Sequence, residues 1–213
     1  MNFAEKGSFM DKSLHEQMLS KNYHGSSKAE ENWDAKANHF NMSQRKDRSG
    51  FAKKVVKVLE ERGLLAGAKV VDIGGGSGRY AIPLAAHADH VTVTDISSNM
   101  LDLAKSNAES LGLDNLSYVK TDWESVDISD LSWSKGFDLA FASMCPAVRS
   151  PGGLRKMIAV SKGFCLINQF IVGVDTMADY FRKTLDIKRS YDPHNDRETV
   201  QALFNLLWPY LPK

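Results

Sequence analysis

Hydrophobic residues recur along this chain with two spacings, and the two alternate from residue 51 onward. Short runs of β-branched and other apolar residues are typical of buried parallel strands. Apolar residues three and four positions apart are typical of amphipathic helices. Such alternation favours a mostly parallel, Rossmann-like α/β sheet with helices on both faces and right-handed crossovers. The predicted strands are residues 69–73, 90–96, 116–120, 137–143 and 164–172, and the predicted helices among them are residues 51–62, 79–88, 98–111 and a segment around 154–158.

The first 50 residues are polar and lie outside this alternation. Trp33, Ala37 and Phe40 fall at offsets 0, 4 and 7, which predicts one face of a helix within residues 27–41. The segment is either an extra helix packed on the sheet or a lid over the reactive end of a bound cofactor. The substrate-side residues that such a lid would contribute are Tyr23, Trp33, His39 and Phe40.

After the last predicted strand, the pattern predicts two further helices at residues 175–185 and 196–211. Two prolines among the last five residues argue against a strand there. The predicted organisation is a helical N-terminal cap, residues 1–50, on a core of residues 51–213, together one structural domain.

Composition narrows the class of protein. The 213 residues suffice for a well-buried α/β core, and the net charge of +1 without a long basic run disfavours nucleic acid as a partner. Two cysteines far apart, Cys145 and Cys165, indicate a reducing cytoplasm without a disulfide framework. No apolar run is long enough to span a bilayer, and residues 1–20 lack the apolar centre of a signal peptide. We therefore expect a cytoplasmic protein without a membrane partner.

A glycine-rich turn follows the first predicted strand. Asp72 stands at the strand's carboxyl end, where open α/β sheets bind ligands. Gly74, Gly76 and Gly78 follow at alternate positions, and glycine permits positive φ and close approach of a ligand to the backbone. The arrangement is typical of a site for a nucleotide-like cofactor.

Acidic residues at the strand ends discriminate between cofactors. Asp95, 17 residues after Gly78, can accept hydrogen bonds from both ribose hydroxyls. Asp122 can accept from the exocyclic amine of adenine, and the indole of Trp123 can pack on its ring. The glycines also satisfy a loose dinucleotide pattern, but Asp72 would repel a pyrophosphate and favour a cationic ligand. For each acid the alternative interpretation is a turn or cap residue.

Three segments in order resemble the class I S-adenosylmethionine-dependent methyltransferases. They are Val71–Gly78, the Asp95-Ile96-Ser97-x-x-Met100-Leu101 motif, and Thr121-Asp122-Trp123, with a Trp-Asp-x-x-Ala-x-x-Phe fragment at residues 33–40 that looks like the family's N-terminal cap. The resemblance implies that the glycine loop cradles the methionine part and ribose of the cofactor. It implies that the three acids hold, in order, the amino group, the ribose and the adenine. The implied cofactor-binding residues are Asp72, Gly74, Gly76, Gly78, Asp95, Ile96, Met100, Asp122, Trp123 and Ser143.

The sequence indicates the methyl acceptor less clearly than the cofactor. Ser143-Met144-Cys145-Pro146 follows the fourth strand, on the family's acceptor side, and does not match the signature of amino-methylating DNA enzymes. Cys145 is a candidate substrate contact, nucleophile or metalloid ligand, with a small buried apolar residue as the alternative. His39 and His194 are candidate acid–base groups or solvated histidines. The six histidines lack ligand spacing, so we expect no metal. The catalytic residues, the methyl acceptor and any general base stay open.

The C-terminus departs from the family pattern, because the closing antiparallel hairpin has no residues here. Either the protein is naturally short or the chain is truncated. In the family's strand order, 3-2-1-4-5, residues 164–172 would form an apolar edge, which predicts self-association unless the terminal helix covers that edge. A lysine at Ile171 would then favour the monomer. The favoured function is methyl transfer from S-adenosylmethionine to a small molecule, leaving S-adenosylhomocysteine. The alternative is a cofactor-binding module with lost or partner-dependent catalysis.

Overall fold

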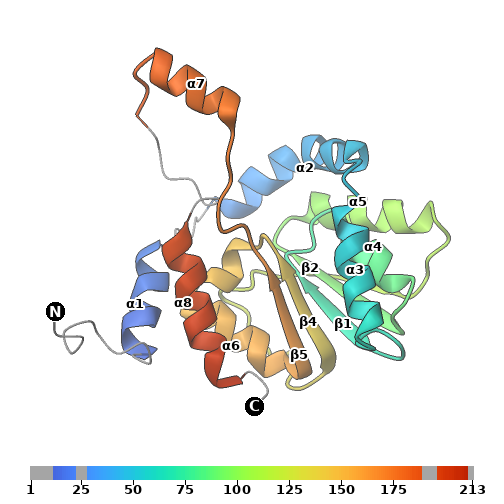
Figure 1. The fold of residues 1–213 in the computed structure, drawn as a ribbon. Coiled ribbons are helices and arrows are strands. Elements are labelled where there is room, and N and C mark those ends of the chain that lie inside the picture. The colour runs from blue at the N-terminus through green and yellow to red at the C-terminus, as the bar shows by residue number, and fades with distance from the viewer. Residues whose placement is uncertain (1–11, 23–27, 189–195, 211–213) are drawn as a thin grey trace. The chain divides into compact units, whose positions relative to one another are not determined.

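The computed structural model describes residues 12–22, 28–188 and 196–210 (Figure 1). The chain divides into two compact units. One is His24–Ile167, which contains the paired sheet and most helices. The other combines Met1–Tyr23 with Asn168–Lys213.

The larger unit is built on a five-stranded parallel sheet in the order β3-β2-β1-β4-β5. In parallel pairing Val71 lies opposite Thr92 on one side and opposite Ala140 on the other. The carboxyl ends of β1 and its neighbours β2 and β4 therefore meet at one edge of the sheet. This confirms the predicted fold class and strand order. The strands are β1 (Lys69–Ile73), β2 (His90–Asp95), β3 (Leu116–Lys120), β4 (Phe137–Ser143) and β5 (Ser161–Asn168).

The fifth strand corrects the prediction for residues 164–172. The strand begins earlier than predicted, at Ser161. Gly163 allows the close approach to β4, because a Cβ at this position would lie only 2.6 Å from the carbonyl oxygen of Asp138. The strand ends at Asn168, so Ile171, where a lysine was expected to test the edge, is not part of it. Within the strand, Phe164 is 52% exposed.

Helices cover both faces of the sheet (Figure 1). On one face, α3 (Phe51–Glu61), α4 (Ala81–Ala85) and α5 (Ser98–Glu109) pack on the sheet. On the other face lies α6 (Pro151–Val160). Side chains alternate between the two cores as strand geometry requires, with Val70 in the first cluster and Val71 in the second.

Local sequence explains where these helices start and stop. Ser97 Oγ accepts from the backbone N–H of Met100 at 3.1 Å and so caps α5. Ser150 caps α6 in the same way, with Pro151 in the first turn. After α3 the chain leaves the helix through Gly63 at φ +68°. The helix α4 is shorter than predicted, since the residues flanking it form turns.

The smaller unit is helical in its described residues. In it α1 (Lys12–Asn22) packs against α8 (Arg197–Leu207), with Leu19 and Leu206 buried between them. The short 3-10 helix Trp208–Tyr210 continues α8. In contrast, α7 (Thr176–Thr184) has no buried residue.

This division differs from the boundary expected at residue 50. The physical reason is that α1 packs with α8, whereas α2 (Ala29–Lys46), which is longer than predicted, packs on α5 of the larger unit. No strand follows β5 within the described residues, so the described part of the chain contains no closing hairpin. No described helix combines the length and apolar character needed to cross a membrane.

Candidate functional site

The glycine loop after β1 is anchored to the end of β2. The backbone N–H of Gly75 donates to the carbonyl of Thr94 at 2.9 Å, and that of Gly76 donates to Oδ2 of Asp95 at 2.9 Å. Gly74 and Gly76 have φ values of +67° and +56°, which other residues adopt only with strain. The loop thus presents bare backbone at the carboxyl edge of the sheet, as the sequence predicts.

Asp72 is the most deeply buried acid at this edge, with 1% of its surface exposed. Its Oδ2 has no hydrogen-bond partner, while the backbone N–H of Ala81 donates to the carboxyl group. Burial, and secondly the charge of Asp95, raise the pKa of Asp72 to about 7. A Cβ on Gly75 would lie 2.8 Å from Oδ2, so glycine keeps the space beside this oxygen free. A cationic ligand group would satisfy the oxygen and neutralise the carboxylate.

Asp95, at the end of β2, is held by backbone donors. The N–H groups of Gly76 and Ser97 each donate to one of its oxygens at 2.9 Å, and that of Ile96 also donates. Burial is the largest influence and raises the pKa of Asp95, against these hydrogen bonds, which lower it. Each carboxylate oxygen keeps a second lone pair that can accept from a ligand hydroxyl.

The helix α2 lies over the glycine loop and is joined to it by polar side chains. Oδ1 of Asp34 accepts from Ser97 Oγ at 2.5 Å and from the backbone N–H of Asn99 at 3.2 Å. Gln44 accepts from Ser77 Oγ at 2.9 Å. The hydrogen bond from Ser97 is the largest cause that lowers the pKa of Asp34. These contacts connect α2 to the glycine loop at Ser77 and to the start of α5 at Ser97 and Asn99.

Aromatic residues of α2 reach the loop itself. A Cβ on Gly76 would lie 3.8 Å from the ring of Phe40 and 3.9 Å from Sδ of Met100. The rings of Trp33 and Phe40 meet edge to face with centroids 5.8 Å apart. The structure therefore brings Phe40 and Met100 to the loop, with Trp33 behind them. His39 is exposed on another side of the helix.

Asp122 occupies the predicted place, at the turn after β3. It is exposed, and its oxygens accept from the N–H of Glu124 at 3.1 Å and the hydroxyl of Ser125 at 2.9 Å. These contacts form a turn, which is the alternative interpretation given above. They leave lone pairs for a ligand, so the adenine contact of Asp122 stays a prediction.

The indole of Trp123 corrects the expectation that it packs on adenine. The side chain is 3% exposed, lies in the core beside Met157, and donates from Nε1 to the carbonyl of Gly153 at 3.0 Å. A buried indole needs an acceptor, and the first turn of α6 supplies one. The ring therefore faces the core and offers no surface to a ligand.

The end of β4 carries Ser143, which is half-buried, and then Cys145, which is 6% exposed. A Cβ on Gly74 would lie 2.6 Å from the thiol sulfur, so the thiol rests on the glycine loop. Burial is the main cause that raises the pKa of Cys145 to about 12. At neutral pH the thiol is protonated, which argues against the nucleophile and metalloid interpretations and favours the small apolar residue.

Other predicted residues fall outside this picture. Tyr23 and His194 lie outside the described residues. In the part of the chain that is described, no three His, Cys, Asp or Glu side chains are grouped so that they could hold a metal ion. Sequence reasoning missed Asp34 and Gln44. Asp34 could have been found, because it stands inside the Trp-Asp-x-x-Ala-x-x-Phe fragment that resembles the family's N-terminal cap. Gln44 lies beyond that fragment.

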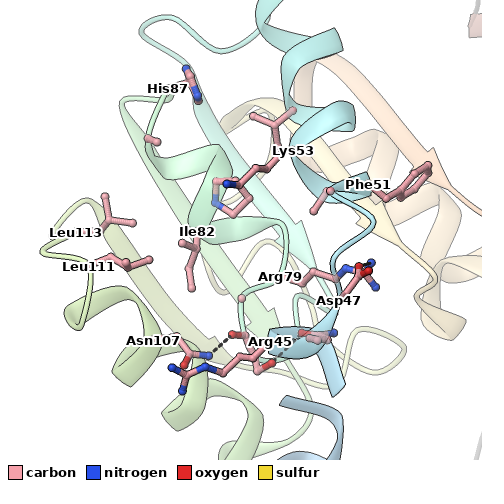
Figure 2. Close-up of a pocket in the computed structure, with 18 of the residues that line it drawn as sticks. Arg45, Asp47, Phe51, Lys53, Arg79, Ile82, His87, Asn107, Leu111 and Leu113 are labelled. Atoms are coloured by element: carbon pink, nitrogen blue, oxygen red, sulfur yellow. Dashed lines mark hydrogen bonds and ion pairs between the residues drawn. The ribbon is translucent and has the colours of Figure 1, made fainter. Parts of the chain in front are cut away.

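A large cavity opens on a different side of the loop (Figure 2). Its volume is about 840 Å³, and it lies among α2, α3, α4 and the end of α5. It touches the loop at Ser77 and Gly78, but Asp72, Asp95 and Asp122 are not among its lining residues. This cavity is therefore distinct from the strand-end site.

A protein-family model described as a methyltransferase domain matches residues 70–162, which span β1 to the start of β5. Residues 70–162 are a methyltransferase domain. For this segment, the match confirms the methyltransferase family predicted from the strand-end acids and glycine loop.

Curated relatives match parts of the chain. It is 38% identical over 95 residues to a 23S rRNA (uracil(1939)-C(5))-methyltransferase of Aeromonas salmonicida, covering 44% of this chain and 20% of that protein. It is 28% identical over 134 residues to the ubiquinone biosynthesis O-methyltransferase of Coxiella burnetii, covering 56% of this chain and 55% of that protein. The chain thus spans about half the length, or less, of these relatives.

Solved structures share the fold at low identity. A putative S-adenosyl-L-methionine-dependent methyltransferase from Methanococcus maripaludis superposes with a TM-score of 0.64 at 20% identity, over 87% of this chain and 88% of that one. A SAM-dependent methyltransferase from Aquifex aeolicus gives 0.53 at 20% identity, over 71% and 90%. Magnesium protoporphyrin IX methyltransferase from Synechocystis PCC 6803, with bound SAH, gives 0.53 at 19%, over 91% and 83%. At these identities the likeness shows the fold alone.

Proposed function

We propose that this chain transfers a methyl group from S-adenosylmethionine to a small molecule. One observation carries the proposal: Asp72, buried at the loop, has a carboxylate oxygen without a partner, and Asp95 stands at the next strand end. The pair suits a ligand with a cationic amino group and ribose hydroxyls. The ubiquinone-biosynthesis relative supports a small-molecule acceptor, and the net charge of +1 gives no support to a nucleic-acid acceptor.

Each residue has a proposed role in holding the cofactor. Asp72 would hold the amino group, Asp95 the ribose hydroxyls and Asp122 the adenine amine, while the glycine loop lets them approach the backbone. When bound, the cofactor supplies a methyl group already activated on a sulfonium. The chain then has to align the acceptor and exclude water. A protonated Cys145 would act there as an uncharged wall of the site.

The test is a methyl-transfer screen with phenols, catechols, carboxylates, amines and thiols, with formation of S-adenosylhomocysteine as the readout. We expect turnover with at least one class, and about ten- to hundredfold less turnover with Asp95→Ala when the cofactor is below saturation. Ribosomal RNA forms a separate arm, because one relative methylates it. If the product binds but no acceptor is methylated, the chain is a cofactor-binding module. The absence of a strand after β5 in the described residues makes that the second candidate.

We also propose that α2 is the lid over the site. It is joined to the loop and to the start of α5 by polar side-chain hydrogen bonds, which water can replace when the helix opens. Hydrogen exchange of residues 33–40 should slow when S-adenosylhomocysteine is added. Equal exchange with and without the ligand would make α2 a plain structural helix.

The outer edge of β5 is the proposed site of self-association. No further strand pairs with β5 in the described sheet, and Phe164 is half exposed on it. An edge strand offers unpaired backbone groups, and a charge on it opposes pairing. Phe164→Lys should therefore shift a dimer to monomer in analytical ultracentrifugation, while Leu111→Lys, on another surface, should not. A native monomer whose amides at 161–168 exchange rapidly would contradict this.

We place the protein in the reducing cytoplasm, with which its two free cysteines are compatible.

A further inference from the structure

The cavity in Figure 2 is not used by the proposed methyl transfer, and we call it the helix cavity. Its volume of about 840 Å³ lies within the range of small-molecule sites. Its apolar lining comes from α3, from α4 and its C-cap, and from the turn after α5: Val56, Ile82, Pro83, Ala86, Leu111 and Leu113. Such a lining suits the hydrocarbon body of a ligand.

The charges around the helix cavity are unequally paired. Arg79 forms an ion pair with Asp47, and Nδ1 of His87 lies 3.1 Å from Oε1 of Glu60. Arg45 and Lys53 also line the cavity, and neither has an ion pair or a side-chain hydrogen bond to any described residue. Arg79 and His87 thus account for both lining acids. Lys57 also lines the cavity, but it pairs at 3.7 Å with Glu61, which does not line it, so Arg45 and Lys53 are the lining cations left over. A ligand that complements the cavity is therefore anionic.

The positions of these cations indicate where an anionic head would lie. Figure 2 shows Arg45 near Asn107 toward one end of the cavity and Lys53 farther along it. Asn107 donates to the carbonyl of Ser77 at 3.0 Å and to Oδ1 of Asn41 at 2.9 Å, which fixes this polar end. A guanidinium binds a carboxylate through two parallel hydrogen bonds, whereas an ammonium acts as a point charge.

We propose that the helix cavity is a second binding site, for an amphipathic carboxylate with an unbranched or ring-shaped hydrocarbon body. Arg45 binds the carboxylate, Lys53 adds positive potential, and the hydrocarbon lies on Ile82 and Pro83. The site is separate from the strand-end acids, so it stands whether or not the methyl acceptor is ever found. A ligand here does not compete with S-adenosylhomocysteine.

The test is calorimetric titration of the full chain with sodium decanoate, in the presence of saturating S-adenosylhomocysteine. We expect one saturable site per chain. Arg45→Gln should weaken decanoate binding about tenfold, the usual scale for loss of one charge-assisted contact. Lys53→Gln should weaken it less. Lys54→Gln is the matched control, because Lys54 is exposed on the same helix but does not line the cavity.

Two further measurements separate this site from other occupants. Ala86→Phe fills the cavity from an exposed position and should abolish binding while thermal unfolding stays unchanged. Uncharged decanol should bind about tenfold more weakly than decanoate. Absence of saturable binding, or equal binding by native, Arg45→Gln and Ala86→Phe proteins, would overturn the proposal. So would a native dimer that Ala86→Phe converts to monomer, because the occupant would then be a second copy of the chain.

Discussion

The ends of β1 and β2 and the end of β4 lie at the same edge of one sheet, but their side chains differ in charge. At β1 and β2, two carboxylates stand 23 positions apart in sequence: Asp72, which is buried and has an unpartnered oxygen, and Asp95, which is half-buried. At β4 the corresponding place holds Cys145, whose thiol is buried and protonated at neutral pH. The first half carries charge and the second half avoids it.

The contrast agrees with the proposed roles of the two halves, in which one binds the cofactor and the other the methyl acceptor. Binding a cationic cofactor requires fixed negative charge, and burial makes each such charge count. An acceptor that only has to be aligned with an activated methyl group needs shape and dryness instead. The two halves meet at Gly74, where the loop touches the thiol.

The largest expected effect is at that junction. Gly74→Ala combines a left-handed backbone with a Cβ 2.6 Å from the sulfur of Cys145, and we expect a loss of about 2–5 kcal/mol in the free energy of unfolding. Chemical denaturation measures it. Gly67→Ala is the control, because Gly67 has φ +70° with nothing within 4 Å, and should lose only about 1–2 kcal/mol. Equal losses would mean that the two halves are not in tight contact.

The charged half is tested next by Asp95→Ala. Removing the proposed ribose contact should weaken binding of S-adenosylhomocysteine by roughly 1.5–3 kcal/mol, about ten- to hundredfold, in calorimetric titration. Asp102→Ala, an exposed acid on α5, should leave affinity unchanged. Unchanged affinity in the Asp95 variant would remove that residue from the site.

A smaller effect is expected from pH. Asp72 has a pKa of about 7, so it is protonated below that pH and loses the charge that a cationic amino group needs. Affinity for S-adenosylhomocysteine should therefore fall as pH falls, by up to about tenfold between pH 8 and pH 6. Asp72→Asn should remove most of this dependence. An unchanged profile in the variant would assign the titration to another group, such as Asp95, whose pKa is also raised.

The smallest effect belongs to the uncharged half. Because burial keeps Cys145 protonated, its thiol should not react with Ellman's reagent in the folded protein, whereas exposed Cys165 should. We expect one rapidly reacting thiol per chain, and the same in Cys145→Ala. Two fast thiols in the native protein would mean that Cys145 is accessible and reopen its role as a nucleophile.

Regular periodicity made the sheet predictable. The strands β1, β3 and β4 have the bounds expected from their apolar runs. The start of β5 was missed because Lys162 and Gly163 look unlike a strand. These two residues belong to the strand because the backbone at Gly163 can approach β4 closely, which is a tertiary effect.

The candidate site was predictable where a residue type has one chemical use at a strand end, as at Asp72. It was not predictable where a side chain can face either the ligand site or the core. The indole of Trp123 turns to the carbonyl of Gly153, thirty residues away, and no local pattern signals that acceptor. The hydrogen bonds of Asp34 to Ser97 and of Gln44 to Ser77 likewise depend on which face of α2 packs on the larger unit.

Ser97 uses its single hydroxyl in two directions: it donates to Asp34 in α2 and accepts from Met100 in α5. The two bonds are chemically independent, because donating uses the proton and accepting uses a lone pair. If α2 moves away, the hydroxyl can donate to water and still cap α5. The hydrogen bond between Ser97 and Asp34 can therefore break without unravelling α5. The proposed opening of α2 would thus be a sub-global event, separate in free energy from unfolding of the sheet.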